Sequence, residues 1–286
     1  MNEDRRRLPA RGDIAAVHLR GKVAAERFVA GRGFHVSVGW VPLLRAPDAA
    51  APIDTELLFG ETFHAYEVRN GWAWGQAESD GYVGYVREDA LMAPAAAPTH
   101  MISVPRSFLL AEPKVTARMR HCVSMNSLLT VTGQQDMFCA VSSSGWIHKD
   151  HIVPIEQHAP DFVAVAALFL GVPYLWGGRT SLGIDCSGLV QIAMQRAGLA
   201  CPRDSDMQAA EIGTPRPAAA EGLRRGDLVF WRGHVGIMMD SENLLHANAH
   251  HMCVASEPLS QAATRIAAGE GGKIIAVRRP DTLCRE

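Results

Sequence analysis

One cysteine of the sequence stands where a thiol can act as a nucleophile. Cys186 follows Asp185 and opens a stretch whose apolar residues have helical spacing, so a helix at 186–197 with Asp185 as N-cap is expected. Free backbone N–H groups and the helix dipole there stabilise a thiolate and predict a pKa below about 8.5 for the thiol. The same N–H groups can stabilise an oxyanion. The alternative is a buried cysteine without chemistry, because most free cysteines are small apolar core residues.

Two histidines could supply the base that a thiolate requires. His234 starts an apolar segment between glycines, and His246 lies in the next β-rich segment. A turn near Asp240 folds the second segment back on the first and brings the two rings together, so that one imidazole orients the other. Taken singly, each histidine is more often structural or exposed, so the triad is a hypothesis about the set.

A metal site competes for part of the same segment. His246, His250, His251 and Cys253 carry ligand atoms that zinc accepts. Strand alternation places His246 and His250 on one face, but no second pair of ligands stands at a matching spacing. We therefore expect neither a metal ion nor an organic cofactor.

The segments around these residues must supply the elements that hold them. Helical spacing and runs of β-formers predict helices at 161–170, 186–197 and 205–212, and strands at 227–231, 234–239, 244–247, 253–255 and 273–277. Helices followed by strands indicate an α+β domain, which we place at 158–286.

Short β-rich segments separated by turns fill residues 35–155, a pattern typical of small barrels. Strands are predicted at 68–77 and 82–86, with Asp80-Gly81 as the hairpin signal. The pattern of residues 84–91 (glycine, aromatic, aliphatic, two polar residues, aspartate, any residue, aliphatic) returns at 145–152. The repeat predicts a barrel of about 60 residues used twice, with a chance match of strand and turn as the alternative.

Alanine- and proline-rich segments punctuate this first part. Residues 46–52 are expected to form a loop within a barrel, and residues 92–99 a linker between barrels. The predicted domains are therefore an N-terminal segment at 1–34 with a helix at 13–28, barrels at 35–93 and 94–157, and the α+β domain at 158–286.

The composition excludes several classes of function. The chain has 286 residues, with 28 Lys plus Arg against 30 Asp plus Glu, which does not favour nucleic-acid binding. Six cysteines without a CxxC pair fit neither a disulfide scaffold nor a common zinc ribbon. The longest apolar run, 162–172, is too short to cross a membrane, and the N-terminus has no apolar stretch of signal-peptide length. A cytoplasmic protein is expected, since unpaired cysteines suit a reducing compartment.

Three sequence blocks stand in the order and near the spacing of a known family: DCSGLV from residue 185, GDLVFW…HVGIM from residue 226, and LLHA from residue 244. They resemble the NlpC family of papain-like cysteine peptidases. The resemblance implies a papain-like α+β fold with Cys186 as nucleophile, His234 as general base and acid, and His246 as the residue that orients His234. It also implies that Tyr174 helps to form the oxyanion site.

A further segment, Pro202-Arg203-Asp204-Ser205, is similar to that of family members that cut γ-D-glutamyl–diamino acid bonds. In such a protein Asp204 holds the free amine of an N-terminal L-alanine, a role that suits a carboxylate because a buried ammonium needs a charged partner. By the same resemblance, the polar contacts to the γ-D-glutamyl group are Asp185, Ser187 and Ser205. The alternative for Asp204 and Ser205 is a helix N-cap, and both roles can coexist.

The barrels resemble the bacterial SH3-like domains that precede the catalytic domain in these endopeptidases. The resemblance implies Glu61 as a second carboxylate for the substrate amine and Tyr82 as a wall of the pocket. The alternative is a barrel turn at Glu61 and a core aromatic at Tyr82. The second barrel shows no equivalent of these two residues and is expected to be structural.

The combined resemblance predicts a cysteine endopeptidase that hydrolyses the γ-D-glutamyl–diamino acid bond of murein peptides with a free N-terminal L-alanine. It releases L-Ala-D-Glu from a peptide whose third residue is meso-diaminopimelate or lysine, in recycling of cell-wall peptide. No nucleic acid, membrane insertion or cofactor is expected. Two alternatives remain: a thiol acyltransferase or amidase on the same papain-like scaffold, and a non-catalytic cell-wall-binding protein.

Overall fold

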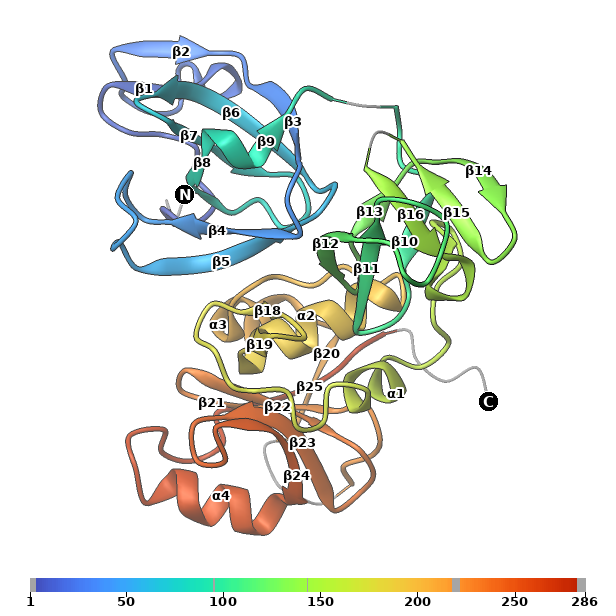
Figure 1. Cartoon of the computed structure of the whole chain (residues 1–286). Coiled ribbons are helices and arrows are strands. Elements are labelled where there is room, and N and C mark those ends of the chain that lie inside the picture. The colour runs from blue at the N-terminus through green and yellow to red at the C-terminus, as the bar shows by residue number, and fades with distance from the viewer. Residues whose placement is uncertain (1–3, 95, 143, 218–221, 282–286) are drawn as a thin grey trace. The chain divides into compact units, whose positions relative to one another are not determined.

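The computed structural model describes residues 4–94, 96–142, 144–217 and 222–281 (Figure 1). The chain divides into two compact units, residues 1–155 and 156–286, and each is described by itself. Strands dominate the first unit, and the α-helices of the described residues lie in the second. None of the helices within these ranges has the length and apolarity that a bilayer crossing requires.

The first part of the N-terminal unit is a seven-stranded antiparallel sheet. Its strands are β3 (Arg32–Val36), β4 (Trp40–Leu44), β5 (Ile53–Leu58), β6 (Thr62–Arg69), β7 (Trp72–Ala77), β8 (Val83–Arg87) and β9 (Leu91–Met92). They pair in the order β5-β4-β8-β7-β6-β3-β9. The loop expected at 46–52 connects β4 with β5.

Eight further strands follow in the same unit. They are β10 (His100–Ile102), β11 (Arg106–Leu110), β12 (Met119–Ser124), β13 (Leu128–Leu129), β14 (Val131–Gln135), β15 (Phe138–Val141), β16 (Gly145–His148) and β17 (Ile152–Pro154). Strand β11 pairs with β12 and β16 as β4 pairs with β5 and β8, and β10 pairs with β13 and β17 as β3 pairs with β6 and β9. The pairing scheme of the first sheet is thus repeated across two smaller sheets.

The sequence repeat coincides with a repeat of local structure. In the first copy β8 is followed by the 3₁₀ turn Glu88–Ala90 and β9, and in the second copy β16 is followed by the 3₁₀ turn Lys149–His151 and β17. The shared aspartate falls inside the 3₁₀ turn in both copies, at Asp89 and Asp150. That the second copy is an SH3-like barrel stays a prediction.

The prediction of a helix at 13–28 is wrong. Ile14–Ala16 form β1 and Arg27–Val29 form β2, a parallel pair, with a 3₁₀ turn at Val17–Leu19 between them. All three residues of β1 are fully buried, a run that a strand covered on both faces produces and a surface helix does not. Gly21 has a φ of 79°, outside the range of a right-handed helix.

The segment 68–77 is also not one strand, because β6 ends at Arg69 and β7 begins at Trp72. Asn70 and Gly71 between them have φ values of 53° and 76°. A type I′ turn requires positive φ at both central residues, and Asn-Gly is its strongest sequence signal. The hairpin signal Asp80-Gly81 does fall in the connection between β7 and β8.

The C-terminal unit is α+β. Its helices are α1 (Phe162–Ala167), α2 (Cys186–Arg196), α3 (Ser205–Glu211) and α4 (Leu259–Ala267). Its strands are β18 (Arg179–Thr180), β19 (Gly183–Ile184), β20 (Thr214–Arg216), β21 (Leu228–Trp231), β22 (His234–Met238), β23 (Asn243–Asn248), β24 (Cys253–Pro258) and β25 (Ala276–Arg279). The sequence did not predict helix α4 or strands β18, β19 and β20, and the strand expected at 273–277 begins later, at Ala276.

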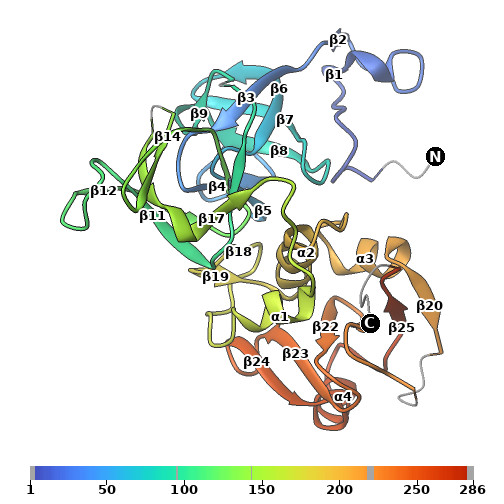
Figure 2. The same ribbon diagram turned by 90° about the vertical axis from the view of Figure 1, so that its right-hand side faces the viewer.

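Six strands of this unit form an antiparallel sheet in the order β20-β25-β21-β22-β23-β24. Helix α2 packs against β22 and β23, and α4 packs against β23 and β24. The two helices lie on opposite sides of the sheet (Figures 1 and 2). Apolar side chains of the sheet and of α4 form a core cluster that includes Val229, Trp231, Met238, Leu244 and Leu259.

Candidate active site

Asp185 holds the turn that carries the candidate nucleophile. Its Oδ1 accepts a hydrogen bond from the backbone N–H of Gly188 at 2.7 Å, so the predicted N-cap of α2 is confirmed. Its Oδ2 accepts from the backbone N–H of Gly177 at 2.8 Å, which joins the loop before β18 to the helix start. Cys186 is the first residue of α2 and is 7% exposed.

Arg203, which the sequence analysis did not single out, completes this arrangement. Its buried guanidinium donates to both oxygens of Asp185, at 2.9 and 2.7 Å, and Nη1 also donates to Oγ of Ser187 at 2.9 Å. Two parallel N–H···O bonds fix the geometry as well as the charge balance. We call Asp185, Ser187 and Arg203 the nucleophile clamp.

Two glycines allow the loop before β18 to approach α2 and β19 closely. A Cβ on Gly188 would lie 2.4 Å from the carbonyl oxygen of Gly178, which is backbone and cannot rotate away. A Cβ on Gly178 would lie 2.4 Å from the carbonyl oxygen of Gly183. The glycines that flank the nucleophile in the sequence are therefore required by backbone packing around it.

The two candidate histidines meet across β22 and β23. The predicted turn is present: Oδ1 of Asp240 accepts from the backbone N–H groups of Glu242 and Asn243, both at 2.7 Å. The hairpin brings Nε2 of His234 to 2.8 Å from Nδ1 of His246. This contact uses one ring nitrogen of His234 and leaves Nδ1 for a proton exchange with another group.

The candidate nucleophile lies against the start of β22. The backbone N–H groups of Val235 and Ser187 act as hydrogen-bond donors to the sulfur of Cys186. Since Val235 directly follows His234, the structure brings Cys186, His234 and His246 into one site. Their catalytic roles stay a prediction.

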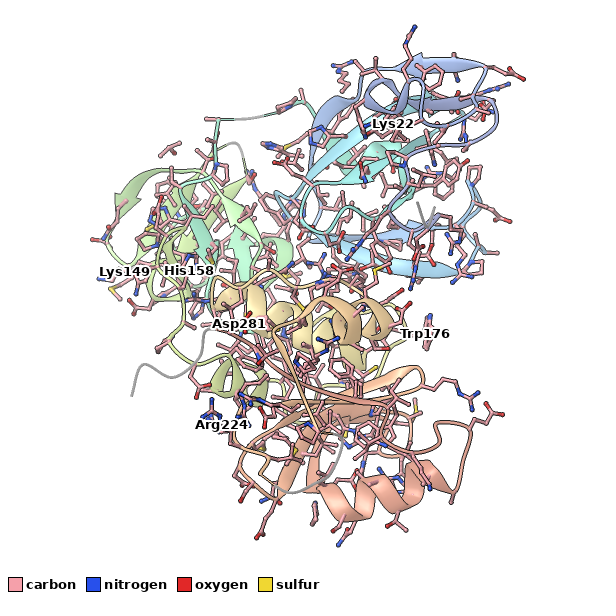
Figure 3. The ribbon with its side chains drawn as sticks, turned by 180° about the vertical axis from the view of Figure 1, so that it is seen from behind. Lys22, Lys149, His158, Trp176, Arg224 and Asp281 are labelled. Carbon is pink, nitrogen blue, oxygen red and sulfur yellow. The ribbon has the colours of Figure 1, made fainter. Side chains whose placement is uncertain are left out.

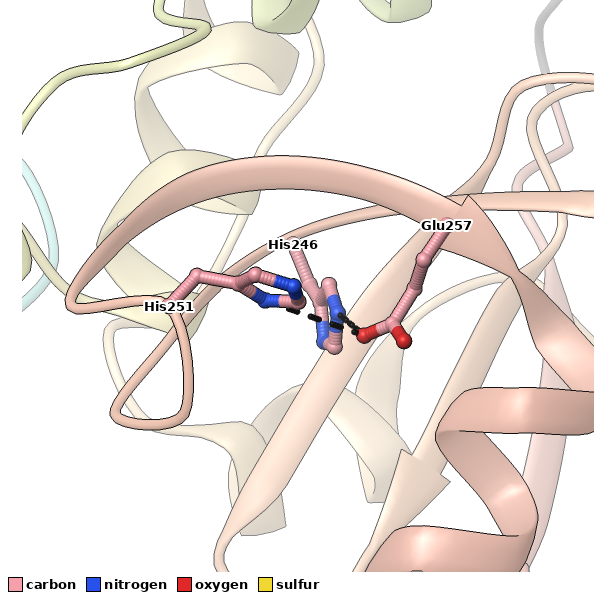
Figure 4. A group of neighbouring side chains, drawn as sticks. All are labelled: His246, His251 and Glu257. Atoms are coloured by element: carbon pink, nitrogen blue, oxygen red, sulfur yellow. Dashed lines mark hydrogen bonds and ion pairs between the residues drawn. The ribbon is translucent and has the colours of Figure 1, made fainter.

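Two more charged residues extend the pair of histidines. Nε2 of His246 lies 2.8 Å from Oε1 of Glu257 on β24 (Figure 4). Both oxygens of Glu257 accept from Arg265 on α4, at 2.7 and 2.5 Å. We call the row His234, His246, Glu257 and Arg265 the histidine line. The sequence analysis missed its last two members.

Burial changes the expected chemistry of the thiol. The pKa of Cys186 is raised to about 12, first because burial disfavours the thiolate and then because the carboxylate of Asp185 lies nearby. Hydrogen bonds from the N–H groups of Val235 and Ser187 lower the pKa of Cys186, but the effect of burial is larger. The predicted lowering of this pKa by the helix start is therefore wrong, and the resting nucleophile is a neutral thiol.

The histidines are neutral as well. Burial lowers the pKa of His234 to about 3, and His246 and Arg265 add to the effect while Glu257 opposes it. Burial also lowers the pKa of His246, again against the effect of Glu257. The hydrogen bond from Arg265 is the main reason that the pKa of Glu257 falls to about 2. At neutral pH the line therefore consists of two neutral imidazoles and one ion pair.

Tyr174 lies beside the nucleophile turn. Its backbone N–H donates to the carbonyl oxygen of Met252 at 2.9 Å, and it bridges to Ile184, two residues before Cys186. Burial raises the pKa of its hydroxyl, and the charges of Cys186 and Asp185 act in the same direction. The hydroxyl therefore stays protonated and keeps the hydrogen that an oxyanion could accept.

Trp176 adds an exposed aromatic surface to the same loop. Its side chain is 66% exposed, although large apolar side chains usually pack inside. The ring stands clear of the ribbon in Figure 3. The loop that joins Tyr174 to the nucleophile turn thus presents an apolar face to solvent.

The structure places Asp204 and Ser205 at the start of α3. Asp204 occupies the N-cap position and is half-buried, but its side chain makes no capping hydrogen bond. Ser205 is the first residue of the helix. Arg203 anchors this segment to the nucleophile clamp, so the two helix starts are held together. Contact of Asp204 and Ser205 with a substrate stays a prediction.

Glu61 and Tyr82 lie in the N-terminal unit. Glu61 is 5% exposed, and its Oε2 accepts from the backbone N–H of Leu58 at 2.9 Å, as expected for a turn residue. Tyr82 is fully buried. These contacts match the turn and core alternatives within that unit, and the role of both residues toward a substrate stays a prediction.

Among the residues that the structure describes, one group of side chains has ligand atoms close enough for a metal ion: His246, His251 and Glu257 (Figure 4). Of the four residues considered from the sequence, His246 and His251 belong to this group, and His250 and Cys253 do not. Glu257 is the third member. Both oxygens of Glu257 already accept from Arg265, and Nδ1 of His251 lies 3.0 Å from Oδ1 of Asn248. A cation would have to compete with the guanidinium, so the donor set fits an ion pair better than a metal.

Comparison with protein-family models matches two regions of the chain. Residues 171–266 match the NlpC/P60 family, and residues 43–91 match the bacterial dipeptidyl-peptidase Sh3 domain. The C-terminal unit carries an NlpC/P60 domain. The first region contains the nucleophile clamp and the histidine line, and the second spans most of the first sheet. The protein is accordingly a cysteine peptidase, a hydrolase, with an Sh3 domain ahead of its NlpC/P60 domain.

Two relatives extend the match over most of the chain. Gamma-D-glutamyl-L-lysine dipeptidyl-peptidase of Bacillus subtilis is 28% identical over 222 residues, 68% of this chain and 72% of the relative. Dipeptidyl-peptidase 6 of Lysinibacillus sphaericus is 28% identical over 233 residues, 72% of this chain and 84% of the relative. A crystal structure of an NlpC/P60 family protein from Bacillus cereus superposes with a TM-score of 0.72 at 20% identity, covering 87% of this chain and 99% of that one. This likeness shows a shared NlpC/P60 fold.

Proposed function

We propose that the NlpC/P60 protein hydrolyses the γ-D-glutamyl–diamino acid bond of murein peptides that carry a free N-terminal L-alanine, and releases L-Ala-D-Glu. The observation that carries this proposal is the row of Cys186, His234 and His246 at the junction of α2, β22 and β23. The names of the two relatives support the γ-D-glutamyl bond and the release of a dipeptide.

In the proposed acylation step, the thiol proton of Cys186 moves to Nδ1 of His234 as sulfur attacks the γ-glutamyl carbonyl carbon. The backbone N–H of Cys186 and the hydroxyl of Tyr174 stabilise the oxyanion. The carbon–nitrogen bond then breaks, and His234 gives its proton to the leaving amine. Because burial holds thiol and imidazole neutral at rest, proton transfer and attack occur together.

In the proposed deacylation step, a water molecule attacks the thioester. One proton of the water moves to His234, its oxygen bonds to the acyl carbon, and the carbon–sulfur bond breaks. The proton then returns from His234 to the sulfur of Cys186. The balance needs only water and yields one carboxylic acid and one amine.

In the proposed substrate complex, the carboxylates of Asp204 and Glu61 hold the ammonium of the N-terminal L-alanine, which makes the enzyme a dipeptidyl-peptidase. Ser187, Ser205 and Tyr82 line the γ-D-glutamyl subsite. Asp185 supports the γ-D-glutamyl subsite by holding its backbone in place, since its two oxygens accept from Gly177, Gly188 and Arg203. The third residue of the peptide is meso-diaminopimelate or lysine.

We place this activity in the recycling of cell-wall peptide in the cytoplasm. The cysteines of the described residues (Cys122, Cys139, Cys186, Cys201 and Cys253) are free thiols, which supports a reducing compartment. A requirement for a free amine also suits peptides already released from the wall. The repeated pairing scheme of β10 to β17 supports two SH3-like barrels ahead of a catalytic domain at 158–286.

Mass spectrometry of the purified protein with L-Ala-γ-D-Glu-meso-diaminopimelate tests the proposal. Its N-acetylated copy and a Cys186→Ala variant serve as controls. We expect L-Ala-D-Glu from the free peptide only, and none from the variant. Equal cleavage of both peptides would contradict the proposed recognition of the free amine. Transfer of the dipeptide to an added amine in preference to water would indicate the acyltransferase alternative.

A further inference from the structure

The four residues of the histidine line form one continuous row of hydrogen bonds. Arg265 donates to both oxygens of Glu257, Oε1 of Glu257 lies 2.8 Å from Nε2 of His246, and Nδ1 of His246 lies 2.8 Å from Nε2 of His234. The inner members are shielded from water, with His246 1% and Glu257 8% exposed. A buried row of this kind allows little freedom in where each proton resides.

The donor and acceptor rules fix the protons along the row. An ionised carboxylate can only accept, so Nε2 of His246 must carry the hydrogen that it shares with Glu257. In a neutral imidazole the other nitrogen is then an acceptor, so Nδ1 of His246 accepts from Nε2–H of His234. His234 is neutral as well, which leaves the lone pair on its Nδ1. This is the nitrogen that must take the thiol proton in the proposed acylation.

We propose that Glu257 is a positioning residue that sets the tautomers of His246 and His234 in series, and that Arg265 keeps Glu257 in its accepting form. The proposal rests on the proposed function only in assigning His234 as the base. It assigns a role to two residues outside the Cys186, His234 and His246 row.

The charges around the row agree with this role. Arg265 faces Glu257 from α4, and His251 faces it from the loop between β23 and β24, with Nδ1 at 4.0 Å from Oε1. The negative charge of Glu257 raises the pKa of His234 against the effect of burial. It therefore also favours the imidazolium that forms when His234 accepts a proton, because the attraction acts through two short hydrogen bonds in a water-poor site.

A Glu257→Gln variant separates tautomer control from packing, because glutamine keeps the size of the side chain but can donate as well as accept. We expect kcat for the murein tripeptide to fall about 100-fold or more with little change in KM, as for the loss of a carboxylate that sets a catalytic histidine's tautomer. The matched control is Glu242→Gln, the same change on the exposed turn between β22 and β23, and its kcat should equal that of the unmodified protein.

Nitrogen-15 NMR of the histidine rings in the full chain reads the tautomers directly and needs no substrate. The unmodified protein should show a hydrogen on Nε2 of both His234 and His246 and none on Nδ1. In Glu257→Gln the two nitrogens of each ring should shift toward a mixture. If Nδ1 of His234 carries the hydrogen in the unmodified protein, the proposal is overturned, whether or not the variant folds.

The rate of Cys186 alkylation by iodoacetamide separates failure of this proposal from failure of the proposed function. A slower rate in Glu257→Gln, with the NMR change, supports the tautomer role even if no murein peptide is cleaved. Equal alkylation, equal tautomers and equal turnover in Glu257→Gln and Glu242→Gln would overturn it while leaving peptidase activity intact. Addition of a chelator should change none of these readouts, and a gain in kcat on chelation would instead assign His246, His251 and Glu257 to a bound metal.

Discussion

The nucleophile clamp and the histidine line each contain an arginine that grips a carboxylate with two hydrogen bonds, yet the two pairs differ in burial. The side chains of Arg203 and Asp185 are 0% and 9% exposed, whereas those of Arg265 and Glu257 are 29% and 8% exposed. The first pair joins two backbone segments around Cys186. The second pair ends the hydrogen-bonded row that includes His246 and His234. The fully buried pair, Arg203 with Asp185, holds the backbone around Cys186 in place. The partly exposed pair, Arg265 with Glu257, keeps the carboxylate beside His246 ionised.

This contrast predicts separate consequences for stability and for activity. Removing one partner of a buried ion pair leaves an uncompensated charge in a water-poor site, which is costly. Removing a partner that solvent can replace costs much less.

Replacement of Arg203 should have the largest effect. We expect Arg203→Met to lower the local stability of α2 by about 3–5 kcal/mol, because Asp185 and Ser187 lose their partner inside the fold. Hydrogen–deuterium exchange of α2 peptides in the full chain measures this. The matched control is Arg225→Met, which breaks the exposed Arg225–Asp161 pair (41% and 38% exposed) and should cost at most about 1 kcal/mol. Equal losses in the two variants would contradict the distinction.

Acid should destabilise the histidine line next. The folded-state pKa of His234, about 3, lies below the ordinary value of 6.5, so the unfolded chain binds more protons between these values. The stability that neutral His234 contributes is complete above pH 6.5 and is lost as pH falls toward 3, by up to about 1.4 kcal/mol per pH unit. Glu257, with a pKa of about 2, adds a loss of the same sign at lower pH.

Urea unfolding at pH 7, 6 and 5 measures that slope. His234→Gln removes the titrating group and should flatten the curve over this range, whereas a change of the exposed His250 to Gln should leave it unchanged. An identical slope in all three proteins would show that burial of His234 does not control the acid response.

A methyl group on Gly188, next to the nucleophile clamp, should have a smaller effect on stability. Gly188→Ala places a Cβ 2.4 Å from the carbonyl oxygen of Gly178, so loop and helix must separate, at a cost of about 1–3 kcal/mol. Gly269→Ala is the control, since its Cβ would meet no atom closer than 3.7 Å. Circular-dichroism melting of both variants provides the comparison, and a Tm for Gly188→Ala equal to that of the control would contradict the close approach.

The smallest stability change is expected at the solvent end of the histidine line. Arg265→Gln should lower the free energy of unfolding by no more than about 1 kcal/mol, because water can reach the place of the guanidinium. The kcat of Arg265→Gln should nevertheless fall, but by less than that of Glu257→Gln, because Arg265→Gln leaves the carboxylate of Glu257 in place. Urea titration and peptide turnover on one preparation test this, and a stability loss as large as in Arg203→Met would remove the contrast between the two pairs.

The sequence predicted the parts of the site that local patterns determine. The helix at Cys186 and the N-cap at Asp185 depend on residues within a few positions of one another. The pairing of His246 with His234 spans twelve residues and was predictable because the turn at Asp240 lies between them. Glu257 could not be found in this way, because its contact with His246 depends on the register of β23 against β24 and on the placement of α4. Arg203 belongs to the segment quoted from the sequence, but its contact with Asp185, eighteen residues away, depends on the packing of the α3 start against α2 and has no local signal.

The errors in the N-terminal unit have a similar origin. Residues 13–28 contain no strong strand signal, and β1 exists because it pairs with β2 and is covered from both sides. Asn70-Gly71 is itself a type I′ turn signal, so the break between β6 and β7 is readable from the sequence, and the prediction of one strand at 68–77 conflicts with it. The expected low pKa of Cys186 is wrong because burial outweighs the effect of the helix start, and burial depends on tertiary packing rather than on local sequence.

Arg203 and Asp204 are consecutive residues with different proposed tasks. One peptide bond separates the side chain that grips Asp185 from the side chain proposed to hold the substrate amine. If Asp204 binds the substrate amine as proposed, any displacement of Asp204 acts on the neighbouring residue whose guanidinium holds Asp185, immediately before Cys186. A substrate without the amine would not displace Asp204, so the proposed amine recognition would bear on the alignment of the sulfur as well as on affinity.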